Sequence, residues 1–405
     1  MTTPATATVS PATPASRRHD LDWLRVVAFG LLIFYHIGMF YVSWGWHVKS
    51  RYAGGSGEGL MLLLNPWRLS LLFFISGVAV KFLIGKVGSR SFMRSRFKRI
   101  FIPLVFGMLV IVPPQTYFEL QRLGELDGGL ARFYLNYLTL DQLYSVITPT
   151  WNHLWYLAYI LVYSLTLALM LRAVPFGVRA GTQRLFERLM RGPFVILVPA
   201  AIFILYRFTL VPYFPTTHDL VSDWASHANY FTVFMLGYGA AKSDVFWTRI
   251  RALRWLTLAS ALLLGAALSL AWANWDMVSA NSLMLQAAQA GRVLYAWLVI
   301  LALLGLAQAH INRPGRVLGY LGEAVYPYYI LHQTIIILIG VWLTPMALGG
   351  GLEFILLTLS TTLGCALLYE YIIRRSSLLR PLFGLKAVPA SKQPLLASAG
   401  SAVQD

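Results

Sequence analysis

The chain has 405 residues, of which 58% are hydrophobic and only 12% are charged, whereas soluble globular proteins have about 25% charged residues. This composition argues against a water-soluble protein and predicts an all-α, polytopic integral membrane protein. The formal net charge of +17 raises the alternative of a nucleic-acid-binding protein, which needs a continuous basic surface. The 33 Lys and Arg residues instead fall mostly in alternate loops, so no nucleic-acid partner is expected.

The apolar residues form ten segments, each close to the roughly 20 residues with which a helix crosses the hydrocarbon core. The loops after the second, fourth, sixth and eighth segments are basic, as are both chain ends near the membrane. Short basic loops stay in the cytoplasm, which places both termini there. The expected helices cover residues 22–43, 62–84, 100–118, 151–171, 193–212, 228–241, 255–274, 289–309, 318–342 and 352–373.

Residues 20–380 are expected to form one membrane domain between two polar ends. The first 16 residues are small and polar and lack the basic start and apolar core of a cleavable signal peptide, and residues 387–405 have a similar composition; the N-terminal tail is expected to cover residues 1–19. Both ends are therefore predicted to be disordered cytoplasmic tails. Cys365 is the single cysteine of the chain and lies in an apolar segment, which predicts core packing and neither a disulfide nor a cysteine metal cluster.

Proline and glycine interrupt several of the apolar segments, among them Pro103, Pro199, Pro327 and Gly77. Broken helices at membrane depth often line a cavity, although both residue types are frequent in membrane helices generally. The two halves of the chain lack the matching pair of interrupted helices expected of an alternating-access transporter. This difference weakens the transporter interpretation without removing it.

The first segment carries Asp22, Arg25 and His36. At about 100° and 1.5 Å per residue, Arg25 and His36 share one helix face and lie about 16 Å apart along the axis. This places Arg25 at the cytoplasmic edge, where Asp22 can pair with it, and His36 in the outer half of the bilayer. Arg25 is equally well explained as an orientation anchor.

His36 is the stronger candidate for a functional residue. Residues 26–46 contain no Asp, Glu, Lys or Arg, so an imidazole among them needs hydrogen-bond partners inside the bundle, and such residues usually mark a site. A neutral imidazole is also a suitable general base near pH 7.

Later in the chain, Arg96 and Arg99 are spaced one helical turn apart. They can bind phosphate oxygens or act as cytoplasmic anchors.

Three further ionisable residues have two interpretations each. Glu323, in the ninth segment, either assists a proton path or forms a structural ion pair. His332 lies nine residues later and about 180° away on a regular helix, so the two need not serve one site. His153, beside Trp155, either contacts a sugar or belongs to the interfacial aromatic belt, and the belt is favoured.

Several motifs together resemble the acyltransferase 3 family of membrane acyltransferases. They are the Arg25 to His36 spacing, FFISG, RFKRIFIP, HLWYL and YPYYILHQ, which occur in the family's order over nearly the whole membrane region. Within the family, the arrangement most resembles enzymes that succinylate osmoregulated periplasmic glucans. This closer resemblance rests on WHVKS, on Arg68 before FFISG and on EYIIRRSSLLRPLFG.

The resemblance implies that the domain 20–380 is an O-acyltransferase of the bacterial inner membrane. It implies transfer of a succinyl group from cytoplasmic succinyl-CoA to hydroxyls of a periplasmic glucan, with no permanently bound cofactor or metal. The implied partners are acyl-CoA, the glucan, membrane lipid and other proteins of glucan synthesis. The alternatives are an O-acetyltransferase of another cell-surface polysaccharide and a transporter or flippase of a lipid-linked sugar.

By the same resemblance His36 is the catalytic histidine, Arg25 its partner, and Arg96 and Arg99 the donor-binding pair. His36 can act as general base, which we favour, or be acylated itself. A succinyl carboxylate needs a cation, for which Arg68 and Arg292 are candidates, although both can be snorkelling anchors. The other candidates are Glu323 for proton transfer, and His153, Trp155 and His332 for acceptor binding.

Overall fold

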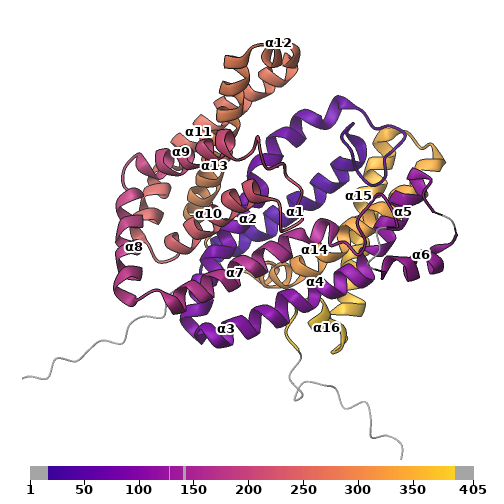
Figure 1. Ribbon diagram of the computed structural model, residues 1–405, viewed down its shortest axis with the longest axis horizontal. Coiled ribbons are helices and arrows are strands. Elements are labelled where there is room, and N and C mark those ends of the chain that lie inside the picture. The colour runs from indigo at the N-terminus through magenta and orange to yellow at the C-terminus, as the bar shows by residue number, and fades with distance from the viewer. Residues whose placement is uncertain (1–16, 127, 140–142, 388–405) are drawn as a thin grey trace, which may run out of the picture.

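The computed structural model describes residues 17–126, 128–139 and 143–387, and all regular elements in these ranges are helical (Figure 1). The predicted tails, apart from residues 17–19 and 387, lie outside the described residues. The α-helices are α1 (His19–Tyr41), α2 (Glu58–Val87), α3 (Ser89–Arg96), α4 (Ile102–Phe106), α5 (Pro113–Leu123), α6 (Leu130–Tyr137), α7 (Trp155–Ala173), α8 (Phe176–Leu189), α9 (Phe194–Thr209), α10 (Trp224–Ala240), α11 (Asp244–Ala273), α12 (Trp275–Ala280), α13 (Ser282–His310), α14 (Arg316–Leu343), α15 (Gly350–Leu367) and α16 (Leu379–Leu382).

The structure confirms an all-α polytopic membrane protein, with a smaller number of candidate spans than the ten predicted. In the described ranges eight helices are long and apolar enough to cross a membrane, or nine if α8 and α9, which meet at a bend of 104°, count as one span. The predicted segments 193–212 and 228–241 form α9 and α10, with 16 and 17 residues. Both are shorter than the roughly 20 residues of a straight crossing.

The predicted third helix is part of a longer span, Ser89–Leu123, which contains wide π-helical turns at Phe97–Phe101 and Gly107–Ile111. Pro103 and Pro113 explain these turns, because a proline has no N–H and its ring displaces the carbonyl four residues earlier. The displaced carbonyls find other donors. The Tyr326 hydroxyl donates to the Arg99 carbonyl at 3.2 Å, and the Tyr134 hydroxyl donates to the Leu109 carbonyl.

Both ends of the described chain lie at the same side of the bundle. The backbone N–H of His19 donates to Asn312 Oδ1, in the connection between α13 and α14, at 3.0 Å. Near the other end, the Arg380 guanidinium lies 3.0 Å from Glu323 Oε1, in the first two turns of α14. The opposite side of the bundle is therefore formed by the connections α1–α2, α5–α6 and α14–α15 (Figure 1).

The helices α2 and α10 cross with their backbones in contact. A Cβ atom added at Gly77 would lie 1.9 Å from the Phe234 carbonyl oxygen, and one added at Gly237 would lie 2.0 Å from the Phe74 carbonyl oxygen. Close approach through small residues is the usual way in which membrane helices gain packing energy. The contact fixes the position of α2, which also carries Arg68.

We expect the substitution Gly77→Ala to destabilise the protein by about 1–3 kcal/mol, because the added methyl group has no space at this crossing. The matched control is Gly30→Ala, since a Cβ atom at Gly30 would have nothing within 4 Å. Thermal unfolding in detergent should show a lower midpoint for the Gly77 variant alone. Equal midpoints for both variants would contradict a backbone contact between α2 and α10.

Candidate active site

Three histidines from distant parts of the chain converge inside the bundle. His36 of α1 and His332 of α14 have Nδ1 and Nε2 atoms 2.7 Å apart, and their rings stack with centroids 5.0 Å apart. The ring of His153, which precedes α7, lies 5.1 Å from that of His332. His36 and His153 line a cavity of about 390 Å³, which we call the histidine cavity.

The hydrogen bond between His332 and the Tyr329 carbonyl determines which nitrogen of a neutral His36 carries the proton. His332 Nδ1 lies 2.7 Å from the Tyr329 carbonyl oxygen, so this nitrogen donates its N–H. In a neutral ring the other nitrogen, Nε2, is then an acceptor, and His36 Nδ1–H donates to it. The same rule leaves the lone pair of neutral His36 on its Nε2 atom, the form that a base requires.

His153 is held on both of its ring nitrogens. Its Nε2 lies 3.2 Å from the carbonyl oxygens of Tyr329 and Ile330, and its Nδ1 lies 3.4 Å from Gln115 Nε2. Its side chain is 5% exposed, so the expectation of an interfacial belt residue is wrong. The residue before it, Asn152, has a left-handed φ of 46°, which asparagine tolerates better than most residues, and this turn precedes the buried His153.

A network of polar side chains at the histidine cavity includes residues that were not predicted from the sequence. His47 Nδ1 lies 2.5 Å from Glu119 Oε2. Gln333 Nε2 lies 3.1 Å from His47 Nε2, from Gln115 Oε1 and from Asn152 Oδ1. His47 and Gln333 belong to the quoted motifs WHVKS and YPYYILHQ, so the motifs could have indicated them, whereas the contacts with Gln115 and Glu119 required the tertiary structure.

Arg68 lies inside the bundle and not at the end of a helix. Its guanidinium carbon is 3.2 Å from the centroid of the Tyr35 ring, and the side chain is 6% exposed. Its Nε and Nη1 atoms are buried without a hydrogen-bond partner among the described residues. Arg68 lines the histidine cavity together with Trp155, whose ring stacks on His218 at 4.0 Å.

Arg25 and Arg96 lie between the histidine cavity and the side where the chain ends. Arg25 Nη2 is 3.6 Å from Asp22 Oδ1, as the spacing predicted, and donates to the Gly322 carbonyl at 3.2 Å. The Nε atoms of Arg25 and Arg96 are buried without a partner among the described residues. The Arg99 side chain is exposed.

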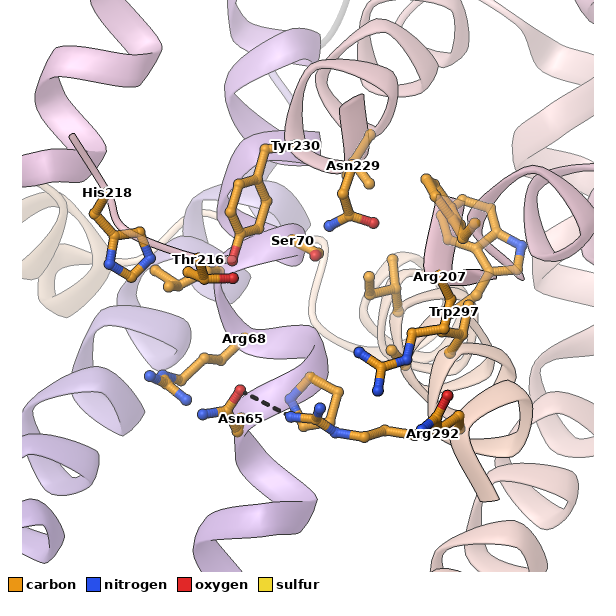
Figure 2. A pocket seen from close by; sticks show the side chains of 18 residues that line it. Asn65, Arg68, Ser70, Arg207, Thr216, His218, Asn229, Tyr230, Arg292 and Trp297 are labelled. Carbon is orange, nitrogen blue, oxygen red and sulfur yellow. Dashed lines mark hydrogen bonds between the residues drawn. The ribbon is translucent and has the colours of Figure 1, made fainter. Parts of the chain in front are cut away.

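Glu323 and Arg292 are among the predicted site residues that do not line the histidine cavity. Glu323 forms an ion pair with Arg380 near the chain ends, and its side chain is 41% exposed. Arg292 donates to Asn65 Oδ1 at 3.2 Å and lines a neighbouring cavity of about 450 Å³, which we call the arginine cavity (Figure 2). Arg68 and His218 line both cavities.

Comparisons with known proteins agree with this arrangement at the level of a family. An acyltransferase domain matches residues 18–370. The glucans biosynthesis protein C of Escherichia coli (strain SMS-3-5 / SECEC) is 26% identical over 156 residues, which cover 37% of each chain. The protein of the same name from Salmonella paratyphi B is 26% identical over 152 residues, which cover 37% of this chain and 38% of that protein.

These alignments limit what the relatives can say about the whole protein. The chain spans 37–38% of the length of these curated relatives, and no solved structure matches it significantly. The domain match, in contrast, covers most of the chain and all of the membrane spans up to the C-terminal part of the last one. The chain therefore belongs to the acyltransferase 3 family and is a multi-pass, membrane-bound O-acyltransferase.

Proposed function

We propose that the protein transfers a succinyl group from succinyl-CoA in the cytoplasm to hydroxyl groups of a periplasmic glucan. The observation that carries this proposal is the contact of His36 Nδ1 with His332 Nε2 at the histidine cavity, which leaves Nε2 of a neutral His36 free to act as a base. The glucan as acceptor is supported by the similarity to glucans biosynthesis protein C.

In the proposed reaction His36 Nε2 removes the proton from the acceptor hydroxyl as its oxygen attacks the thioester carbonyl. The tetrahedral intermediate carries its negative charge on the former carbonyl oxygen. It collapses by breaking the C–S bond, and the departing thiolate takes the proton from His36. The products are the ester and free coenzyme A thiol. His332 stabilises the protonated His36 by accepting its Nδ1–H.

The developing oxyanion needs hydrogen-bond donors that are already in place. Asn152 is the candidate donor, because its Oδ1 accepts from Gln333 Nε2 and its NH₂ group remains available to donate. Trp155, which also lines the histidine cavity, offers an indole N–H. His153 has both nitrogens engaged, so its proposed role is to hold α7 against α14.

The donor is proposed to enter from the side that holds both chain ends, which the basic loops assign to the cytoplasm. Arg96 and Arg99 are its proposed phosphate ligands, with Arg25 closer to the cavity.

We expect Arg96→Gln to raise the apparent Kd for a thioether analogue of succinyl-CoA about tenfold in calorimetric titration, because a charge-assisted contact is lost. The control is Lys98→Gln, two residues later, where the side chain is exposed. An unchanged Kd in the Arg96 variant would assign this residue to membrane anchoring.

Arg68 is the proposed ligand of the succinyl carboxylate, since it is buried beside His36 with two unpartnered nitrogens. We expect Arg68→Gln to lower kcat/KM for succinyl-CoA about tenfold or more and to leave kcat/KM for acetyl-CoA nearly unchanged, because acetate has no second carboxylate. Arg51→Gln, at an exposed loop position, serves as control. Equal losses with both donors would show that Arg68 supports the cavity structurally.

The deciding experiment uses purified protein in liposomes, with labelled succinyl-CoA or acetyl-CoA on one side and a glucan on the other. Formation of a succinyl ester is the expected result. Formation of an acetyl ester alone would assign an O-acetyltransferase. Movement of an unmodified sugar without ester formation would contradict the proposed reaction and favour a transporter.

A further inference from the structure

The arginine cavity is lined by arginine side chains whose positive charge is not balanced by carboxylates among the described lining residues. Arg68, Arg207 and Arg292 line it, and among the described residues that line it there is no Asp or Glu (Figure 2). Figure 2 shows the guanidinium groups of Arg207 and Arg292 pointing toward the same space, with Asn65 between Arg292 and Arg68. Arg207 is half-buried and Arg292 is exposed, so a ligand can reach both guanidinium groups, and an anion in this cavity would meet them without competition from a carboxylate among the lining residues.

An apolar pocket of about 210 Å³ adjoins this cavity and shares Arg207, Gln289 and Arg292 with it. Its other walls are almost entirely apolar and come from α2, α11, α13 and the start of α12. Leu62, Leu63, Leu268, Trp272, Leu285 and Ala288 are among them. A ligand that occupied both spaces would have a negatively charged group between the arginines and a hydrocarbon part directly beside it.

The apolar pocket lies on the surface that faces lipid. In an apolar stretch of 18 residues of α11 only 17% are buried, and this helix lies at the edge of the bundle (Figure 1). Trp272 and Trp275 stand where α11 ends and α12 begins, and tryptophan is enriched at the interface between bilayer and water. Gly59 and Leu62, in the first turns of α2, place the pocket in the half of the bundle opposite the chain ends.

We propose that Arg207 and Arg292 bind the phosphate of an anionic membrane lipid, with its acyl chain in the apolar pocket. Guanidinium groups present paired N–H donors that match phosphate oxygens, and two of them flank this space. Asn229, Thr216 and Gln289 supply polar groups for the hydroxyls of the head group. The head group extends toward Asn65 and Arg68, the residues through which the arginine cavity joins the histidine cavity.

The test is retention of lipid by the purified protein without any acyl donor, measured by native mass spectrometry, so its result does not depend on the transfer reaction. Phosphatidylglycerol and phosphatidylcholine are titrated in detergent, with sn-glycerol 3-phosphate as the soluble competitor. We expect about tenfold tighter retention of phosphatidylglycerol than of phosphatidylcholine, and no displacement by glycerol phosphate at equal concentration.

The variants separate the phosphate contact from the apolar contact. Arg207→Gln and Arg292→Gln, alone and together, should each weaken retention of phosphatidylglycerol about tenfold, and Ala288→Phe should do so by filling the pocket. Arg292→Lys should keep part of the retention, and Arg132→Gln, an exposed position on α6, should keep all of it. Unchanged retention in the double Arg→Gln variant would overturn the proposal. Displacement by glycerol phosphate combined with normal retention in Ala288→Phe would also overturn it, because the site would then bind a soluble phosphate.

Discussion

Substitution of His36 by alanine is expected to lower the rate of ester formation about 10²–10⁴-fold, the usual contribution of a positioned general base. This range corresponds to roughly 3–5 kcal/mol of transition-state stabilisation. The physical reason is that the lone pair of His36 Nε2 lies at the histidine cavity and that the N–H of its other nitrogen is held by His332. Single-turnover measurement with labelled succinyl-CoA and a glucan tests this expectation directly.

The control for this experiment is His310→Ala, at an exposed position at the end of α13. Both variants should insert into the membrane and unfold at similar temperatures, so that loss of rate is attributable to chemistry. Wild-type turnover in the His36 variant would refute its catalytic role. Accumulation of a labelled acyl-protein in the wild type that disappears in His36→Ala would instead identify His36 as a covalent nucleophile.

Substitution of His332 by leucine is expected to lower kcat about 10- to 100-fold and to leave KM for the donor nearly unchanged. Leucine cannot accept the N–H of His36, so this donor loses its buried partner, at a cost of about 1–3 kcal/mol, and the ring of His36 loses its preferred tautomer. The effect falls on kcat because the contact acts on the base and not on substrate binding. Steady-state kinetics with succinyl-CoA separates the two parameters.

A positioning role is distinguished from a purely structural one by His332→Gln, whose side-chain oxygen can also accept the N–H of His36. We expect this variant to recover a substantial part of kcat. Equal loss of kcat in the leucine and glutamine variants, with unfolding temperatures also equally lowered, would assign His332 to packing. His332 is completely buried, so unfolding temperatures of both variants belong to the measurement.

Much of the fold and part of the site are encoded locally and could be predicted. Apolar segments of membrane-crossing length specify helices regardless of their neighbours, and the spacing of Asp22 and Arg25 on one helix specifies their contact, which the structure confirms at 3.6 Å. The burial of Cys365 follows from its apolar segment and is also confirmed. Each of these features depends on one continuous stretch of chain.

The parts that were missed depend on how helices meet. The contact between His36 and His332 joins residues 296 positions apart, and no local pattern specifies it. His153 is buried by contacts with α14 and Gln115, and these partners are distant in the sequence. The count of ten spans rested on hydropathy alone. The shortness of α9 and its bend against α8 depend on tertiary packing, which hydropathy does not describe.

Pro103 of α4 also links the arginine-bearing span to α14. Tyr326 donates to the Arg99 carbonyl that Pro103 displaces, and His332 follows Tyr326 on the same continuous helix, α14. Six residues of helix measure about 9 Å. The distance between the span that carries Arg96 and the residue that orients His36 is therefore set by a short stretch of one helix that includes Pro327, so a change of the helix geometry at this proline would alter the spacing of the two regions.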